Sequence, residues 1–183
     1  MSRLPMPAES DLSPRQKEVL DQVRNGPRGG VRGPFAAMIR SPELAVLAQE
    51  LGAHVRFRSC LNDRVREIVI CRTAAHLKAQ YEWFAHARIG REAGIAEATL
   101  EAMRKGETPT GMPEDEAVAF AFTDEMLRTN RVSDATYAKA KETFGEEGVI
   151  EIVGASGYYS LVALTLNVAE VPLPDGEPLP FPE

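Results

Sequence analysis

The chain has 183 residues, of which 44% are hydrophobic, enough for one globular domain with a sizeable core. Its formal net charge is −6 and its basic residues are spread among acidic ones, which argues against a nucleic-acid partner. No apolar run approaches the roughly 20 residues of a membrane span, and the first eleven residues lack the apolar core of a signal peptide. We therefore expect a cytoplasmic protein with no membrane partner.

The first half of the chain predicts helices separated by proline and glycine. Residues 1–12 contain Pro5 and Pro7 and are expected to form an extended arm. Ser13 followed by Pro14 is typical of a helix start. Residues 25–34 hold four glycines and two prolines and should form a loop. The helices expected in this half cover residues 14–24, 35–40, 42–56, 63–76, 78–93 and 96–105. In the helix over 42–56, the expected buried stripe is Leu44, Leu47, Ala48 and Leu51.

The second half continues the helical pattern. Helices are expected over residues 113–128, 133–145 and 147–167. Residues 171–183 form a tail with five prolines, expected to be either disordered or wrapped around a neighbour. The sequence therefore predicts an all-α fold with a single domain over residues 13–170.

Three ionisable residues are the main candidates for chemistry. Glu82 and His86 lie four residues apart in a predicted helix, which places a carboxylate and an imidazole on one face. Glu67 lies one helix upstream among apolar residues, and a helical hairpin would bring it to the same point. Two carboxylates and a histidine can transfer protons. The alternatives are a salt bridge from Glu67 to a neighbouring arginine and an exposed Glu82–His86 pair.

Metal and thiol chemistry find less support in the pattern. Di-metal sites in helical bundles use Glu-x-x-His in two copies, whereas this chain has one Glu-x-x-x-His. His54 and His76 lack acidic companions at helical spacing and are expected to be structural. Cys60 and Cys71 lack the C-x-x-C spacing and are expected to be free thiols. We expect neither a metal nor a cofactor.

The run Arg64-x-x-Glu67, followed by Tyr81-Glu82-Trp83-x-x-His86 and Gly94-Ile95, resembles the carboxymuconolactone decarboxylase family, which includes the AhpD-like alkylhydroperoxidases. The resemblance covers residues 35–103 well and the rest loosely. It implies an all-α, AhpD-like helical bundle that assembles as a homo-oligomer, a trimer or a hexamer. It also implies an active site between helices, often near a subunit boundary.

The family divides into two chemistries. AhpD-like members carry a Cys-x-x-Cys motif that ends four residues before the histidine, where this chain has Ala79 and Glu82. Peroxide reduction through a disulfide needs both thiols, so that mechanism is not expected here. The decarboxylase-like members lack these cysteines and act on a lactone acid made from aromatic compounds.

The resemblance therefore implies a cofactor-free acid/base lyase that acts on a small, anionic ring or lactone compound. In this hypothesis His86 shuttles the proton, Glu82 orients it and Glu67 completes the relay. The candidate substrate contacts are Arg28, Arg32, Tyr81 and Trp83, with the two arginines as an anion clamp. The alternatives are an AhpD-like protein without a disulfide redox pair and a non-catalytic helical oligomer that binds a small molecule.

Overall fold

The computed structural model describes residues 2–25, 30 and 33–182, and its longer elements are all α-helices, as the sequence predicts. A 3₁₀ turn, η1, covers Glu9–Asp11. Arg28 and Arg32, the candidate anion clamp, lie outside the described residues. The helices are α1 (Pro14–Asn25), α2 (Phe35–Met38), α3 (Pro42–Phe57), α4 (Asp63–His76), α5 (Gln80–Glu92), α6 (Glu97–Lys105), α7 (Glu114–Thr129) and α8 (Asp134–Ala169).

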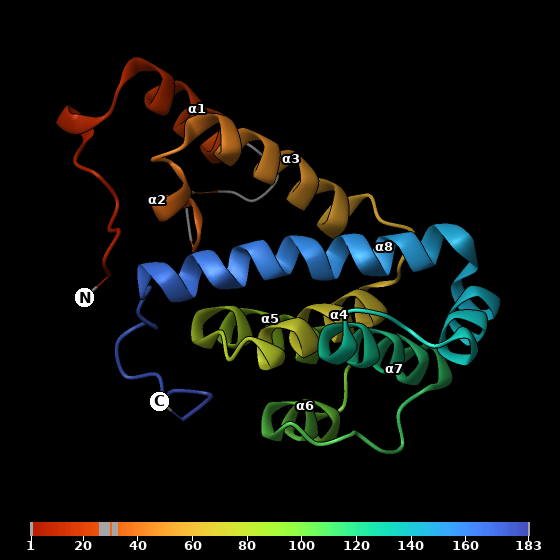
Figure 1. The fold of residues 1–183 in the computed structure, drawn as a ribbon. Coiled ribbons are helices and arrows are strands. Elements are labelled where there is room, and N and C mark those ends of the chain that lie inside the picture. Colours follow the sequence, from red (N-terminus) through yellow and green to blue (C-terminus); the bar gives the residue numbers. More distant parts are fainter. Residues whose placement is uncertain (1, 26–29, 31–32, 183) are drawn as a thin grey trace.

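Helix α8 divides the molecule into two layers. Figure 1 shows α1, α2 and α3 on one side of α8, and α4, α5, α6 and α7 on the other. Helix α4 packs against α5, α7 and α8, and nine of its fourteen residues are buried. A helix covered on several sides must be apolar over most of its circumference, which explains its continuous run of valine and isoleucine. A polar side chain on the covered faces of α4, such as that of Glu67, is therefore held inside the protein.

The two helices expected over residues 133–145 and 147–167 form one continuous element with a break. Gly145 has φ +71° and ψ 178° inside α8, a conformation that an L side chain rarely adopts. The break therefore falls at the last residue of the first predicted helix. By length and composition alone α8 could cross a membrane, but half of its most apolar window is buried inside the protein, as in a core helix.

Helix α3 buries a different stripe from the expected one. Leu44, Leu47 and Leu51 were expected inside, but they are 43–68% exposed. The buried positions are instead mostly small, and include Ala45, Ala48 and Gly52. Small side chains allow α3 to approach α1 and α8 closely, and the leucines therefore face outward. The prediction was right for Ala48 and wrong for the three leucines, because hydrophobicity alone does not show which of two adjacent stripes meets a neighbour.

The two ends of the chain pack against helices of the same chain. Arg3 forms an ion pair with Glu170 at 2.6 Å, and the hydroxyl of Ser2 donates to the carbonyl of Ala169. At the other end Phe181 is only 4% exposed. The proline-rich tail, expected to be disordered or wrapped around a neighbour, thus folds back on its own chain over its described residues, up to residue 182.

Substituting Gly148→Ala should destabilise the protein by about 1–3 kcal/mol, the usual cost of overpacking. A Cβ at position 148 would lie 2.5 Å from Cβ of Phe144, so the backbone near the break at Gly145 would have to shift. Gly154→Ala is the matched control, because a Cβ there meets nothing within 4 Å. It should be neutral or stabilise by up to about 1 kcal/mol. Urea unfolding measures both, and equal effects of the two changes would contradict this account.

Candidate functional site

Helices α4 and α5 form a hairpin joined by residues 77–79. Lys78 takes a positive φ of 48° in this turn, and the amide of Ala79 donates to the carbonyl of Ala74. The hairpin places the middle of α4 beside the middle of α5. Glu67 of α4 and His86 of α5 consequently face each other, as the sequence predicts for a hairpin.

The three predicted ionisable residues form one contact group. Nδ1 of His86 lies 2.6 Å from Oε2 of Glu67, and its Nε2 lies 3.2 Å from Oε1 of Glu82. Glu67, Glu82 and His86 are 1%, 4% and 5% exposed. The exposed-pair alternative is therefore excluded for Glu82 and His86. The imidazole is held between two buried carboxylates.

The surrounding carboxylates set the protonation of His86. Burial by itself lowers the pKa of this imidazole, but the charges and hydrogen bonds of Glu67 and Glu82 outweigh burial and raise the pKa from 6.5 to about 9. At neutral pH the ring is thus an imidazolium that carries one proton on each nitrogen. The site therefore holds a transferable proton on an imidazole that contacts two carboxyl groups.

An arginine on α4 is a weaker neighbour of the group. Nε of Arg66 lies 3.8 Å from Oε1 of Glu67, while Nη2 of the same side chain binds Asp63 at 2.9 Å. The salt-bridge alternative for Glu67 is therefore present in part, but the shorter contact is to His86. The other arginines of α4, Arg64 and Arg72, pair with acids of α7.

Tyr159 of α8 lies beside the three predicted ionisable residues. Its ring packs edge-to-face on the imidazole of His86, with centroids 4.8 Å apart. Its hydroxyl is buried and has no hydrogen-bond partner among the described residues. Burial, followed by the charge of Glu82, raises the pKa of this phenol well above 10, so the group is a hydrogen-bond donor. No sequence spacing links Tyr159 to His86, because the contact depends on how α8 crosses α5.

The thiols are not arranged for redox catalysis. Cys71 lies one helical turn after Glu67, and burial together with the charge of Glu67 raises the pKa of its thiol well above 9. Cys60 is exposed as a residue. Partial burial of its sulfur, followed by the charge of Glu147, nevertheless raises the pKa of its thiol as well. Both cysteines are free, and both resist forming the thiolate that peroxide chemistry requires.

The remaining predicted contacts lie along the first turns of α5. Trp83 is buried, and the ring of Phe181 packs edge-on against it with centroids 5.5 Å apart. Tyr81 is half-buried and lines a pocket of about 510 Å³ together with Gln80. A Cβ at Gly33 would lie 3.3 Å from Cε1 of Tyr81, so the glycine-rich loop ends against this ring.

The other histidines lie apart from this group. Nε2 of His54 contacts Oε1 of Glu151 at 2.5 Å, which links α3 to α8. Burial, followed by the charge of Arg72, lowers the pKa of His76. Among the described residues, no group of three or more His, Cys, Asp and Glu side chains has the arrangement of a metal site.

The stability of the protein should fall as the pH rises from 6.5 to about 9, because the folded state binds the His86 proton more tightly than the unfolded state does. Protonation of His86 contributes about 3 kcal/mol to the free energy of unfolding. This contribution is complete below pH 6.5 and is lost as the pH rises through the pKa of the folded state. Urea unfolding across this range measures it. In His86→Gln this fall should be absent, and an unchanged fall in that variant would refute the raised pKa.

No family model and no curated protein matches the chain, whereas solved structures do. One is the alkylhydroperoxidase AhpD core of an uncharacterized peroxidase-related protein from Ralstonia eutropha JMP134. It has a TM-score of 0.76 and 18% identity, over 95% of this chain and 93% of that chain. Another is a variant of the debrominase Bmp8 in complex with 2,3,4-tribromopyrrole. It has a TM-score of 0.72 and 15% identity, over 96% of this chain and 93% of that chain.

These similarities extend over nearly the whole chain, including the α4–α5 hairpin that holds Glu67 and His86. At this level of identity they establish the architecture and not the activity. The protein has the AhpD-like, all-α fold.

Proposed function

We propose that the protein is a carboxymuconolactone decarboxylase-like enzyme, a cofactor-free lyase that acts on a small carboxylated ring or lactone compound. The observation that carries the proposal is the His86 imidazolium between the carboxylates of Glu67 and Glu82. Such a group can give a proton to a developing negative charge and then recover it. The buried setting strengthens these electrostatic interactions and limits side reactions with water.

The distances favour an exchange of the roles expected for the two carboxylates. Glu67 makes the shorter contact, 2.6 Å to Nδ1, so it is the group that orients the imidazole. Glu82 meets Nε2 at 3.2 Å and lies in the first turn of α5, next to the pocket residue Tyr81. We therefore assign the relay of protons between substrate and His86 to Glu82.

The proposed reaction breaks the bond between a ring carbon and its carboxylate. Carbon dioxide leaves, and the electron pair of that bond stays on the substrate, delocalised towards the lactone carbonyl. His86 gives, through Glu82, the proton that converts this carbanion into the product, and solvent then restores the proton of His86. The hydroxyl of Tyr159 is a second donor for the developing oxyanion. Arg28 and Arg32 remain the candidates for holding the leaving carboxylate.

One of the similar solved structures supports the proposal that the ligand is small. The Bmp8 variant has the same fold and was solved with 2,3,4-tribromopyrrole, a small ring. The AhpD core similarity points to a peroxidase-related alternative, but this chain has Ala79 and Glu82 at the expected cysteine positions. Protonation chemistry therefore fits this chain better than thiol chemistry.

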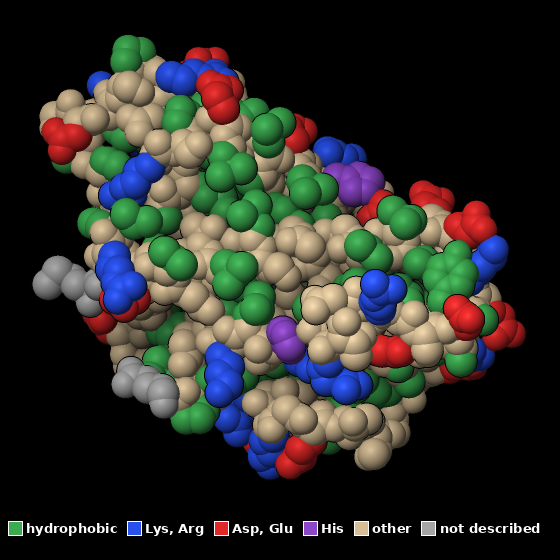
Figure 2. Space-filling view, viewed as in Figure 1, with side chains coloured by type: hydrophobic (Ala, Val, Ile, Leu, Met, Phe, Trp, Pro, Cys, Tyr) green, Lys and Arg blue, Asp and Glu red, His purple; other side chains and the backbone are tan. Residues whose placement is uncertain are grey.

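We also propose that the chain forms a homo-oligomer through an outer apolar surface of α3 and α8. Figure 2 shows hydrophobic side chains gathered over these helices. On α8 the exposed aliphatic residues recur every three, four or eight positions and form one stripe, and α3 has a similar stripe. We call this surface the α3–α8 face. Its residues are Leu44, Leu47, Leu51, Ile150, Val153, Leu161, Leu164 and Val168.

A second copy of this chain is the occupant that fits the α3–α8 face. Its eight side chains are each 36–68% exposed, an apolar area on the order of the 800 Å² per partner that a stable interface buries. A net charge of −6 and the half-buried state of α8 disfavour an anionic membrane surface. The trimer or hexamer implied by the resemblance would cover this face.

Purified protein should decarboxylate γ-carboxymuconolactone at a rate that a chelator leaves unchanged, and it should show no thiol-dependent peroxide reduction. Glu67→Gln, Glu82→Gln and His86→Gln should each lower kcat by about 100-fold or more, the range for general acid/base groups. Turnover should also fall above pH 9, where His86 loses its proton.

Glu116→Gln is the matched control for these variants, because Glu116 is an equally buried carboxylate that pairs with Arg64 outside the site. It should keep the kcat of the unsubstituted protein. Folding of each variant is checked by circular dichroism. Lactone turnover that survives in folded His86→Gln would refute the assignment, and turnover of peroxide without lactone loss would favour the peroxidase-related alternative.

Leu47→Glu and Leu164→Glu should each convert the oligomer into a monomer, because a charge would be buried at the centre of the α3–α8 face. Size-exclusion chromatography with light scattering measures the mass. Tyr137→Glu is the control, because Tyr137 is 41% exposed on α8 but lies outside the stripe. An unsubstituted protein that runs as a 20.0 kDa monomer would contradict the proposal.

A further inference from the structure

The C-terminal segment forms one wall of the pocket that Tyr81 lines. We call residues 171–182 the C-terminal strap. The pocket has a volume of about 510 Å³ and lies between the first turn of α5, the last turns of α8 and the strap. The volume is within the range of small-molecule sites. Its principal lining residues are Tyr81, Leu166, Asn167, Leu173 and Leu179.

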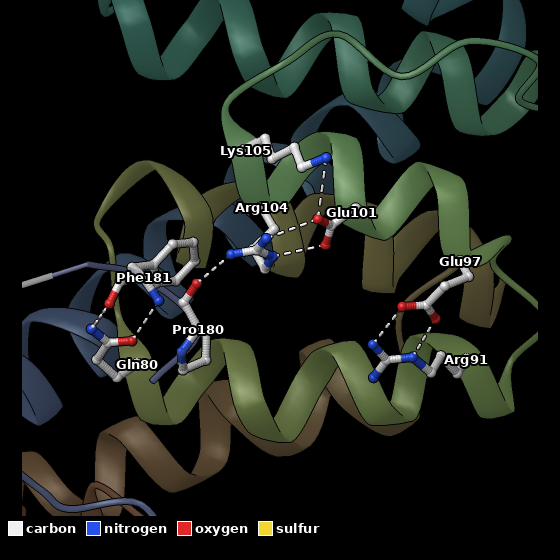
Figure 3. A network of polar contacts seen from close by, with 8 residues as sticks. All are labelled: Gln80, Arg91, Glu97, Glu101, Arg104, Lys105, Pro180 and Phe181. Carbon is white, nitrogen blue, oxygen red and sulfur yellow. Dashed lines mark hydrogen bonds and ion pairs between the residues drawn. The ribbon is translucent and has the colours of Figure 1, made fainter. Parts of the chain in front are cut away.

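Two side chains fasten the strap to the helices beside the pocket. The amide of Gln80 donates to the carbonyl of Phe181 at 2.8 Å and accepts from its backbone N–H at 2.9 Å. Nη1 of Arg104 donates to the carbonyl of Pro180 at 2.8 Å. Glu101 holds Arg104 through two further hydrogen bonds, as Figure 3 shows. The strap is therefore attached through its backbone near one end.

The pocket lies along the same helix–helix contact as the buried imidazole. Helix α5 meets α8 through His86 and Tyr159, and the pocket joins Tyr81 of α5 to Leu166 of α8. From the His86–Tyr159 contact to the pocket, the residue number falls on α5, to Tyr81, and rises on α8, to Leu166. The two helices therefore run antiparallel. Seven residues of helix separate Tyr159 from Leu166, which corresponds to about 10 Å. The pocket is thus about two helical turns from the imidazole.

The strap also covers the side chain next to Glu82. The ring of Phe181 packs edge-on against Trp83, which is 4% exposed. Glu82 and Trp83 are consecutive residues on α5, and Glu82 contacts His86. Release of the strap would uncover Trp83 and open the first turns of α5 from the pocket side. The same segment therefore walls the pocket and covers the residue that follows Glu82 on α5.

We propose that this pocket binds the body of the substrate and that the strap is its movable wall, fastened by Gln80 and Arg104. The pocket takes a monocyclic compound with an apolar ring and one or two oxygen substituents. Leu166, Leu173 and Leu179 contact the ring, and the hydroxyl of Tyr81 and the side-chain oxygen of Asn167 meet the substituents. The side-chain nitrogen of Asn167 already donates to a backbone carbonyl, which leaves its oxygen as an acceptor. This inference rests on the proposed function, because it gives the ring substrate its binding site.

Trp83 is the sole tryptophan of the chain, so its fluorescence reports on the strap without any assay of turnover. Phenol and benzoate serve as probes, titrated separately, and they distinguish neutral from anionic ring compounds. The unsubstituted protein should give a saturable change with at least one probe, together with weak acrylamide quenching of Trp83. Gln80→Ala and Arg104→Ala should increase quenching and weaken probe binding by about tenfold, as expected when a few hydrogen bonds that order the wall are lost.

Glu97→Gln is the matched control. Glu97 of α6 pairs with Arg91 of α5, away from the strap, as Figure 3 shows. It should leave quenching and binding unchanged. Leu166→Gln should weaken probe binding without increasing quenching, because it alters the pocket and leaves the strap attached. Equal probe affinity in the Gln80, Arg104 and Leu166 variants and the unsubstituted protein would overturn the proposal, as would the absence of saturable binding by either probe.

The result is separable from the test of the proposed function. If lactone turnover depends on His86 while the pocket variants keep normal probe binding and normal KM, the acid/base proposal stands and the pocket proposal fails. If probes bind in a strap-dependent way while no lactone is consumed, the pocket proposal stands and the reaction was assigned wrongly.

Discussion

The contact between one buried imidazole and two buried carboxylates is the constraint on which the rest of the site depends. An isolated charge is costly inside a protein, so Glu67, Glu82 and His86 can remain buried only while they compensate one another. The charges and hydrogen bonds of the two glutamates raise the pKa of His86, and the imidazole lies between the two carboxyl groups. The arrangement requires α4 and α5 to stay in register, because a small shift of either helix would leave a carboxylate without a partner.

The surrounding helices shield Glu67, Glu82 and His86 from solvent and fix their positions. Helix α4 is covered by α5, α7 and α8, so Glu67 cannot relax towards solvent. Tyr159 closes the group from α8 through the edge of its ring. The strap adds a cover that is fastened by only a few hydrogen bonds, in contrast to the helical core. In the proposed site, the buried Glu67–His86–Glu82 group is thus combined with a wall held by fewer contacts, a feature typical of segments that open locally.

The chemistry suited to this centre is proton transfer. Thiol chemistry needs a thiolate, and burial beside Glu67 disfavours the charged form of Cys71. The AhpD-like fold is therefore used here with a carboxylate, Glu82, at a position where AhpD-like proteins are expected to carry cysteine. The same hairpin can serve either purpose because it brings two consecutive helices together around one histidine.

The sequence by itself determined the all-α class, most helix boundaries and the meeting of Glu67 with Glu82 and His86, because helical spacing and a short hairpin are local properties. The break at Gly145 was likewise visible as a glycine at the end of the first of two helical patterns. The outward-facing leucines of α3, the approach of Tyr159 and the return of the tail onto Trp83 were decided only by tertiary structure. Each depends on which helix surfaces meet across a long stretch of chain, and that choice is set by packing of the whole molecule rather than by the local pattern.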